Sequence, residues 1–170
     1  ENLMKGIRYF DKDEHLLVCT ADIPLITPAT INGFVSKCKE TKGDFCYPVV
    51  EKSLNVKLYP ELERTYVKVK EGTFTGGNIV YIKSSVIQSS LPLIEKMVNY
   101  RKSPLKMARV FGFWFFVKLL LGRLSIEDAE KKVFNILNIK AKCIISEHPE
   151  IANDVDKLSD VIVVNAHLSK

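Results

Sequence analysis

The sequence has few of the features that mark nucleic-acid-binding, secreted or membrane-spanning proteins. Only five of its 170 residues are arginine and they form no stripe, so a net charge of +5 favours small anionic ligands such as nucleotides over nucleic acid. The first ten residues lack the basic and then apolar regions of a secretory signal. There is no internal repeat or low-complexity segment, and 46% of residues are hydrophobic, so we expect one globular cytoplasmic domain over residues 1–170.

Cysteine and histidine are also sparse, which argues against two kinds of site. The four cysteines have no CxxC spacing, so neither a zinc site nor a disulfide framework is indicated, and we expect reduced thiols. None of the three histidines adjoins a serine or cysteine that could act as a nucleophile, so covalent catalysis has little support. The sequence also contains neither the P-loop motif nor the GxGxxG dinucleotide motif.

One long apolar run is present, but it is poorly suited to crossing a membrane. Residues 105–122, LKMARVFGFWFFVKLLLG, are interrupted by Lys106, Arg109 and Lys118. A membrane-spanning helix needs about 20 predominantly apolar residues, so we expect no stable span. We interpret the run as a helix packed in the core, with an amphipathic helix on a membrane or a partner as the alternative.

Short apolar runs alternate with helical patterns along the chain, which predicts an α/β fold. Strands are expected at residues 16–20, 45–51, 66–70, 78–83 and 141–146, and helices after Thr27 and after Ser125. Pro48 places the strand at 45–51 at a sheet edge or a bulge. Residues 84–138 are expected to form a helical insertion that is broken near Pro92. The predicted architecture is a three-layer sandwich with a mixed sheet.

Two acidic segments follow predicted strands and are candidates for binding a metal ion. Asp22 comes directly after the apolar run at 16–20, at the carboxyl end of a strand where α/β proteins bind ligands. Asp154 and Asp156 flank Val155, and alternate residues of an extended segment point to one side. Mg²⁺ prefers such carboxylate oxygens together with substrate phosphates. Each aspartate could instead be a helix cap or a solvated loop residue.

A glycine-containing segment, residues 70–78 (KEGTFTGGN), is a third candidate. Consecutive glycines allow the backbone to approach a ligand closely and to take positive φ. The alternative interpretation is a tight hairpin-like turn between two strands. The polar and glycine residues that could line a substrate pocket here are Glu71, Thr75, Gly76, Gly77 and Asn78.

In order and spacing, the segments VCTADIPLITPATI, KEGTFTGGNIVYI and PEIANDVDKLSDV resemble the MobA-like NTP transferases, which have the nucleotide-diphospho-sugar transferase (GT-A-like) fold. The resemblance implies an Mg²⁺-dependent nucleotidyltransferase that moves a nucleotidyl group from an NTP to a phosphorylated acceptor. It implies that Asp22 and Asp156 are the catalytic metal ligands, with Asp154 as a further ligand. It also implies that Thr75 to Asn78 line the acceptor pocket, with Glu71 a further candidate.

The sequence departs from this family at one motif. Members begin with a strand and a glycine-rich loop of the form GGxSxRMG followed by a lysine, and no such motif occurs here. We therefore interpret the chain as a C-terminal part of such a domain, or as a degenerate relative, and expect it to have little transferase activity alone. A sheet edge left exposed in this way predicts a homodimer.

Two other functions fit parts of the pattern. A glycosyltransferase of the same fold would use Asp154-Val155-Asp156 as its metal motif, although that motif usually follows a central strand in mid-domain, and here it lies near the C-terminus. A non-catalytic nucleotide-binding or assembly module would fit the missing loop and the apolar helix. Nucleotide binding without turnover would favour the latter.

Overall fold

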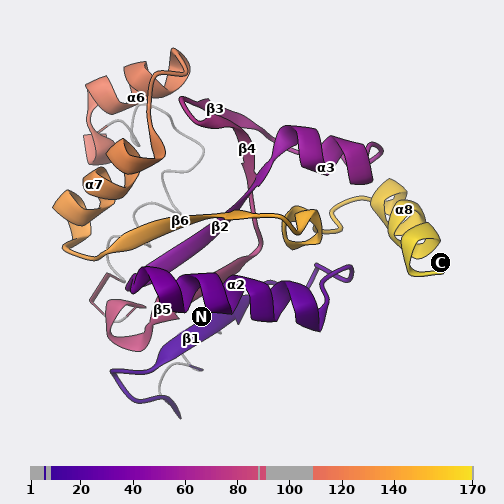
Figure 1. Ribbon diagram of the computed structural model, residues 1–170, viewed down its shortest axis with the longest axis horizontal. Coiled ribbons are helices and arrows are strands. Elements are labelled where there is room, and N and C mark those ends of the chain that lie inside the picture. Colours follow the sequence, from indigo (N-terminus) through magenta and orange to yellow (C-terminus); the bar gives the residue numbers. More distant parts are fainter. Residues whose placement is uncertain (1–5, 7–8, 88, 91–108, 170) are drawn as a thin grey trace.

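The computed structural model describes residues 6, 9–87, 89–90 and 109–169, which form a mixed six-stranded sheet with helices on both faces (Figure 1). The strands are β1 (His15–Cys19), β2 (Phe45–Glu51), β3 (Val67–Val69), β4 (Gly72–Gly76), β5 (Ile79–Lys83) and β6 (Ala141–Ser146). The helices are α2 (Pro28–Thr41), α3 (Lys52–Leu58), α6 (Phe113–Leu120), α7 (Ile126–Leu137), the short 3-10 helix η2 (Pro149–Ala152) and α8 (Leu158–Leu168). The predicted α/β three-layer architecture is confirmed.

Strand β2 is the centre of the sheet. It pairs in parallel with β6 along Phe45 to Val50, and antiparallel with two strands on its other side. Of these two, β5 pairs with the start of β2 and β4 with its end. β1 extends the sheet beyond β5, and β3 extends it beyond β4.

The prediction that Pro48 marks a sheet edge is wrong, because Pro48 lies in the middle of β2, the central strand. The alternative, a bulge, agrees with the interruption of the antiparallel pairing beside Pro48. Its carbonyl accepts a hydrogen bond from the Gly77 amide (2.9 Å), so the backbone of Pro48 points away from β6. On that side, β5 pairs up to Cys46 and β4 pairs from Val49 onward. The proline therefore lies between the two pairings, where its missing N–H leaves no ladder bond unmade.

The hairpin interpretation of the double glycine is also wrong. β4 and β5 do not pair with each other in the described sheet; both run antiparallel to β2, one after the other. The chain therefore continues in the same direction through Gly77 and Asn78, whereas a hairpin would reverse it.

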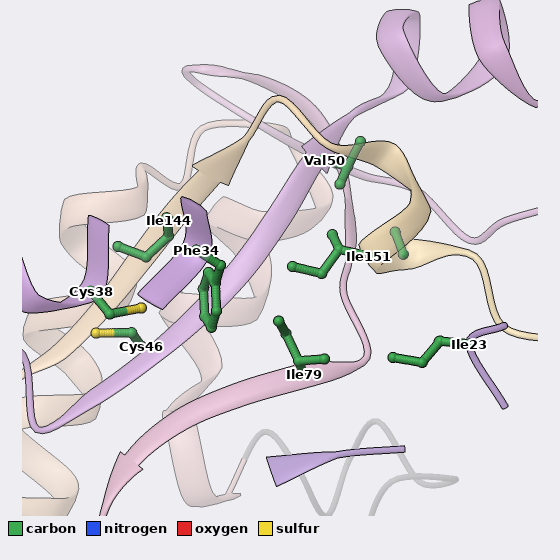
Figure 2. Close-up of a cluster of buried hydrophobic side chains, with 9 residues drawn as sticks. Ile23, Phe34, Cys38, Cys46, Val50, Ile79, Ile144 and Ile151 are labelled. Atoms are coloured by element: carbon green, nitrogen blue, oxygen red, sulfur yellow. The ribbon is translucent and has the colours of Figure 1, made fainter. Parts of the chain in front are cut away.

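Helix α2 begins as the sequence predicts and covers one face of the sheet. The Thr27 side chain accepts a hydrogen bond from the Thr30 amide (3.2 Å), and Pro28 occupies the first turn. The helix ends on Lys42 in the left-handed conformation (φ 50°), one residue before the expected Gly43. Figure 2 shows the core on this side, in which Phe34 and Cys38 of α2 face Cys46 and Ile79 of the sheet.

A second cluster fills the opposite face of the sheet. Ile82 of β5 packs there with Ile139, and α7 contributes Val133 and Leu137. Phe45 belongs to this cluster while its neighbour Cys46 belongs to the first, as expected for adjacent residues of a strand. Both faces of the central strand are thus buried, and the sheet is held rigid between α2 and α7.

Helix α6 differs from its prediction. We expected the apolar run at 105–122 to pack in the core, but none of the residues of α6, all of which the structure describes, is buried. The run is also broken at Gly112, whose φ of 92° separates α6 from the helical residues 109–111. No helix in the described part of the chain is both long and apolar enough to cross a membrane. The predicted break near Pro92 lies outside the described residues.

Candidate functional site

The structure brings together the three aspartates that the sequence singled out. Carboxylate oxygens of Asp22, Asp154 and Asp156 all lie within 4.8 Å of one another. Asp22 follows β1, whereas the other two belong to the segment between η2 and α8. A backbone hydrogen bond from the Val155 amide to the Asp22 carbonyl (2.9 Å) ties the two segments together. We call these three residues the aspartate group.

Asn78 holds the backbone beneath the aspartate group. Its carbonyl accepts from the Thr20 amide (3.0 Å) at the end of β1, and its own amide donates to the Ile151 carbonyl (2.8 Å) in η2. The Asn78 side chain donates to Asp154 (3.2 Å). This residue therefore links β1, β5 and the acidic segment, which explains why residues about 130 positions apart meet.

Asp154 is held more tightly than the other two members. Arg64 donates to its carboxylate and to its backbone carbonyl, and the two side chains are only 10% and 20% exposed. Asp22 and Asp156 are exposed. The group therefore has one oriented carboxylate on the protein side and two that face solvent.

Asp160, an acidic residue four positions after Asp156, serves a different purpose. Its carboxylate accepts from the Asp156 and Lys157 amides (3.1 and 3.0 Å) at the start of α8. Burial works against the charged form of Asp160, but these amide donors hold the pKa of the carboxyl below its ordinary value. Asp160 thus caps α8 and fixes the backbone that carries Asp156.

The chemistry of the aspartate group fits a hard divalent cation. The group has three carboxylates, and the Arg64 guanidinium pairs with one of them, that of Asp154, so the group retains negative charge. Mg²⁺ takes oxygen ligands, commonly one or two carboxylates with substrate phosphates completing the shell. Two solvent-facing carboxylates beside an anchored one leave room for such phosphates.

The glycines beside Asn78 are required for packing and not for unusual backbone angles. Neither Gly76 nor Gly77 takes a positive φ. A Cβ on Gly77 would lie 2.8 Å from Cγ of Pro48 and 3.2 Å from the Ile151 carbonyl oxygen, and one on Gly76 would lie 2.2 Å from the Tyr47 hydroxyl. The glycines let β4 and β5 run close against β2 and η2.

Thr75 and Gly76 line a cavity of about 430 Å³ between the sheet and helices α6 and α7. Most of its lining is apolar, including Phe45, Val69 and Phe74. Such a lining suits an apolar group better than a phosphate. The predicted role of Thr75 and Gly76 in binding a phosphorylated acceptor therefore gains no support from their surroundings.

Glu71, which lies between β3 and β4, is not part of the aspartate group and instead contacts the start of α7. Both of its carboxylate oxygens accept from the Ile126 amide (3.0 and 3.1 Å), and Ser125 accepts from the Asp128 amide (3.0 Å). The structure thus gives Glu71 a capping contact with the helix N-terminus. A role in substrate binding stays a prediction.

One solved structure resembles this chain along most of its length. It is a hypothetical transferase from Thermus thermophilus, with a TM-score of 0.87 and 36% sequence identity over 94% of this chain and 68% of that chain. The chain belongs to the same family as that protein. It therefore has a transferase-like α/β fold. A scan against protein-family models and a search of curated proteins found no match.

Sequence reasoning missed several residues that support the aspartate group in this member of the transferase family. Arg64 donates to Asn153 (3.1 Å), which is fully buried and donates in turn to Asn55 (2.9 Å). Asn55 donates to the Tyr66 hydroxyl (3.0 Å). Nothing in the pattern around Arg64 marks it, because it lies in an irregular segment between α3 and β3. The one signal of these supporting residues in the sequence was Asn153, which directly precedes Asp154.

Proposed function

We propose that this chain carries the metal-binding part of a MobA-like, Mg²⁺-dependent nucleotidyltransferase. The reaction would move a nucleoside monophosphate from an NTP to a phosphorylated acceptor and release pyrophosphate. The observation that carries the proposal is the convergence of Asp22, Asp154 and Asp156 from two distant segments. The family relation to a protein described as a transferase supports it.

The aspartate group would hold Mg²⁺ at the phosphates of the NTP. When bound, the ion would neutralise charge on the phosphates and orient them for in-line attack. Asp154 is positioned by Arg64 and Asn78 before any ligand arrives, so little reorganisation is needed. The roles of Asp22 and Asp156 are then to complete the ion's shell from the solvent side. No covalent enzyme intermediate is required.

The proposal is tested by isothermal titration of the chain with CTP, GTP and ATP in the presence and absence of Mg²⁺. We expect at least one nucleotide to bind in a metal-dependent way, and Asp22→Asn to weaken that binding roughly tenfold or more. The matched control is Glu40→Gln, which removes one exposed carboxylate at the far end of α2 from Asp22. Equal affinity in Asp22→Asn and Glu40→Gln would overturn the proposed role of Asp22.

A further inference from the structure

Helix α6 is almost entirely apolar, and yet several of its side chains are exposed in the described part of the structure. Its sequence, FWFFVKLL, contains one polar residue, Lys118. A helix that is apolar all round is normally found inside a protein core or within a membrane. Here Phe113 is 68% exposed, Trp114 75% and Leu120 85%, and Leu121, which follows the helix, is 61% exposed.

The other side of α6 is anchored, so the exposed residues belong to a fixed surface. Leu119 lines the cavity beneath the helix together with Leu124, and the Leu124 carbonyl accepts a hydrogen bond from the Lys70 amide (2.9 Å) next to β3. Figure 1 shows α6 at one end of the molecule, with α8 at the opposite end. We call Phe113, Trp114, Lys118, Leu120, Leu121 and Arg123 the α6 surface.

Positive charge accompanies this surface. Lys118 and Arg123 are exposed within it, and a shallow depression next to it is lined by Trp114, Lys131 and Lys132 together with Asp128. Lys118 pairs with Asp128 (3.4 Å) and Lys131 with Glu127 (2.6 Å), so these four basic side chains outnumber the two acidic ones and a net positive charge remains. In the sequence, seven basic and no acidic residues occur between Glu95 and Glu127. Because the whole chain carries +5, the rest of it is net negative. Along the sequence, positive charge is thus concentrated in the segment that contains α6, and Arg109, Lys118 and Arg123 of these seven residues belong to the described part of the structure.

We propose that the α6 surface docks on an anionic lipid membrane. Helices that lie in a membrane interface combine Trp, Phe and Leu with Lys and Arg, and they bury their apolar side by about 5–10 Å at the headgroup boundary. Basic residues next to such a helix are attracted to anionic headgroups. A second copy of the chain fits less well, because a two-fold contact would bring the two positive surfaces together.

Trp114 makes the test direct, since it is the only tryptophan in the chain. The chain is mixed with vesicles of phosphatidylcholine alone, or of phosphatidylcholine with phosphatidylglycerol, and binding is measured by flotation and by tryptophan emission. We expect binding to the anionic vesicles, a shift of the emission to shorter wavelength, and quenching by brominated lipid. Binding should weaken at high salt, because screening reduces the electrostatic attraction.

Two variants keep Trp114 as the probe and separate the apolar contribution from the charge. Phe113→Ser/Leu120→Ser should abolish the emission shift, and Lys118→Glu/Arg123→Glu should weaken binding roughly tenfold or more. The matched controls lie elsewhere: Leu158→Ser/Ile162→Ser on α8, where these side chains are 79% and 68% exposed, and the exposed Lys57→Glu on α3. Circular dichroism verifies that each variant folds.

Binding lost in the α6 variants and retained in the controls supports the proposal. Three results would overturn it: no binding to anionic vesicles, equal loss in the α6 and α8 variants, or an emission shift that depends on protein concentration without lipid. The last result would mean that a second copy covers the surface.

Discussion

Individual residues where β2, β4 and η2 meet show which structural constraints cannot be predicted from the sequence. The Gly76-Gly77 pair suggested positive φ or a hairpin, but the structure uses both glycines to bring backbones close together. The position of Asp22 could be predicted, because an acidic residue that follows an apolar strand has a defined place in an α/β sheet, whereas its role as a metal ligand stays a prediction. Arg64 could not be predicted, because its partner Asp154 lies 90 residues away.

Substitutions of the two glycines should differ in cost. Gly77→Ala places a methyl group against the Pro48 ring and the Ile151 carbonyl, neither of which moves easily, and should destabilise the fold by about 1–3 kcal/mol. Gly76→Ala meets the hydroxyl end of Tyr47, which is 36% exposed and can swing away, so its cost should be smaller. Urea unfolding measures both. Adding Tyr47→Phe should restore part of the loss in Gly76→Ala but none of that in Gly77→Ala, and the reverse pattern would contradict this account.

At the scale of helices and strands, local signals were reliable where the element is amphipathic and capped. Thr27 and Ser125 begin helices as predicted, because a side-chain oxygen satisfies a free amide of the first turn. Strand pairing was not predictable, since the neighbours of β2 depend on contacts between distant segments. The prediction that α6 packs in the core was wrong, because an apolar run indicates that a helix favours surroundings without water but does not indicate what covers it.

Helix α7 gives an element-scale prediction. Ser125→Ala should cost about 1 kcal/mol of stability by removing the cap, and Glu71→Ala about 0.3–1 kcal/mol by removing the acceptor for the Ile126 amide. Both should speed hydrogen exchange in the first turn of α7. Glu61→Ala, an exposed substitution elsewhere, serves as the control. Unchanged exchange in Glu71→Ala would show that its contact with α7 does not stabilise the helix.

At the scale of the whole molecule, the sheet separates two apolar clusters, one under α2 and one under α7. The three-layer arrangement could be predicted because apolar runs of strand length alternate with amphipathic helices. The predicted dimer through a sheet edge and the predicted low activity of the chain alone stay predictions. The four cysteines are all unpaired and all described by the structure, so the reactivity of their thiols measures how well the packed layers exclude a reagent.

Thiol labelling of the native chain should show one fast and three slow cysteines. Cys19 is exposed, whereas Cys38 and Cys46 are fully buried. The neighbouring Cys38 thiol lowers the pKa of Cys46, but reagent cannot reach this buried thiol, and burial raises the pKa of Cys143 to about 12. Reaction with a chromogenic disulfide checks this, and all four should react at once in urea. A second fast thiol in the native state would contradict the closed packing.

The central claim is that the aspartate group binds a divalent cation, and Mn²⁺ titration followed by electron paramagnetic resonance tests it most directly. We predict one Mn²⁺ site in the wild-type chain and in Glu40→Gln, displaced by excess Mg²⁺, and roughly tenfold or more weaker binding in Asp22→Asn and in Asp156→Asn. Mn²⁺ affinity that is the same in all four proteins, or no binding to any of them, would contradict the account.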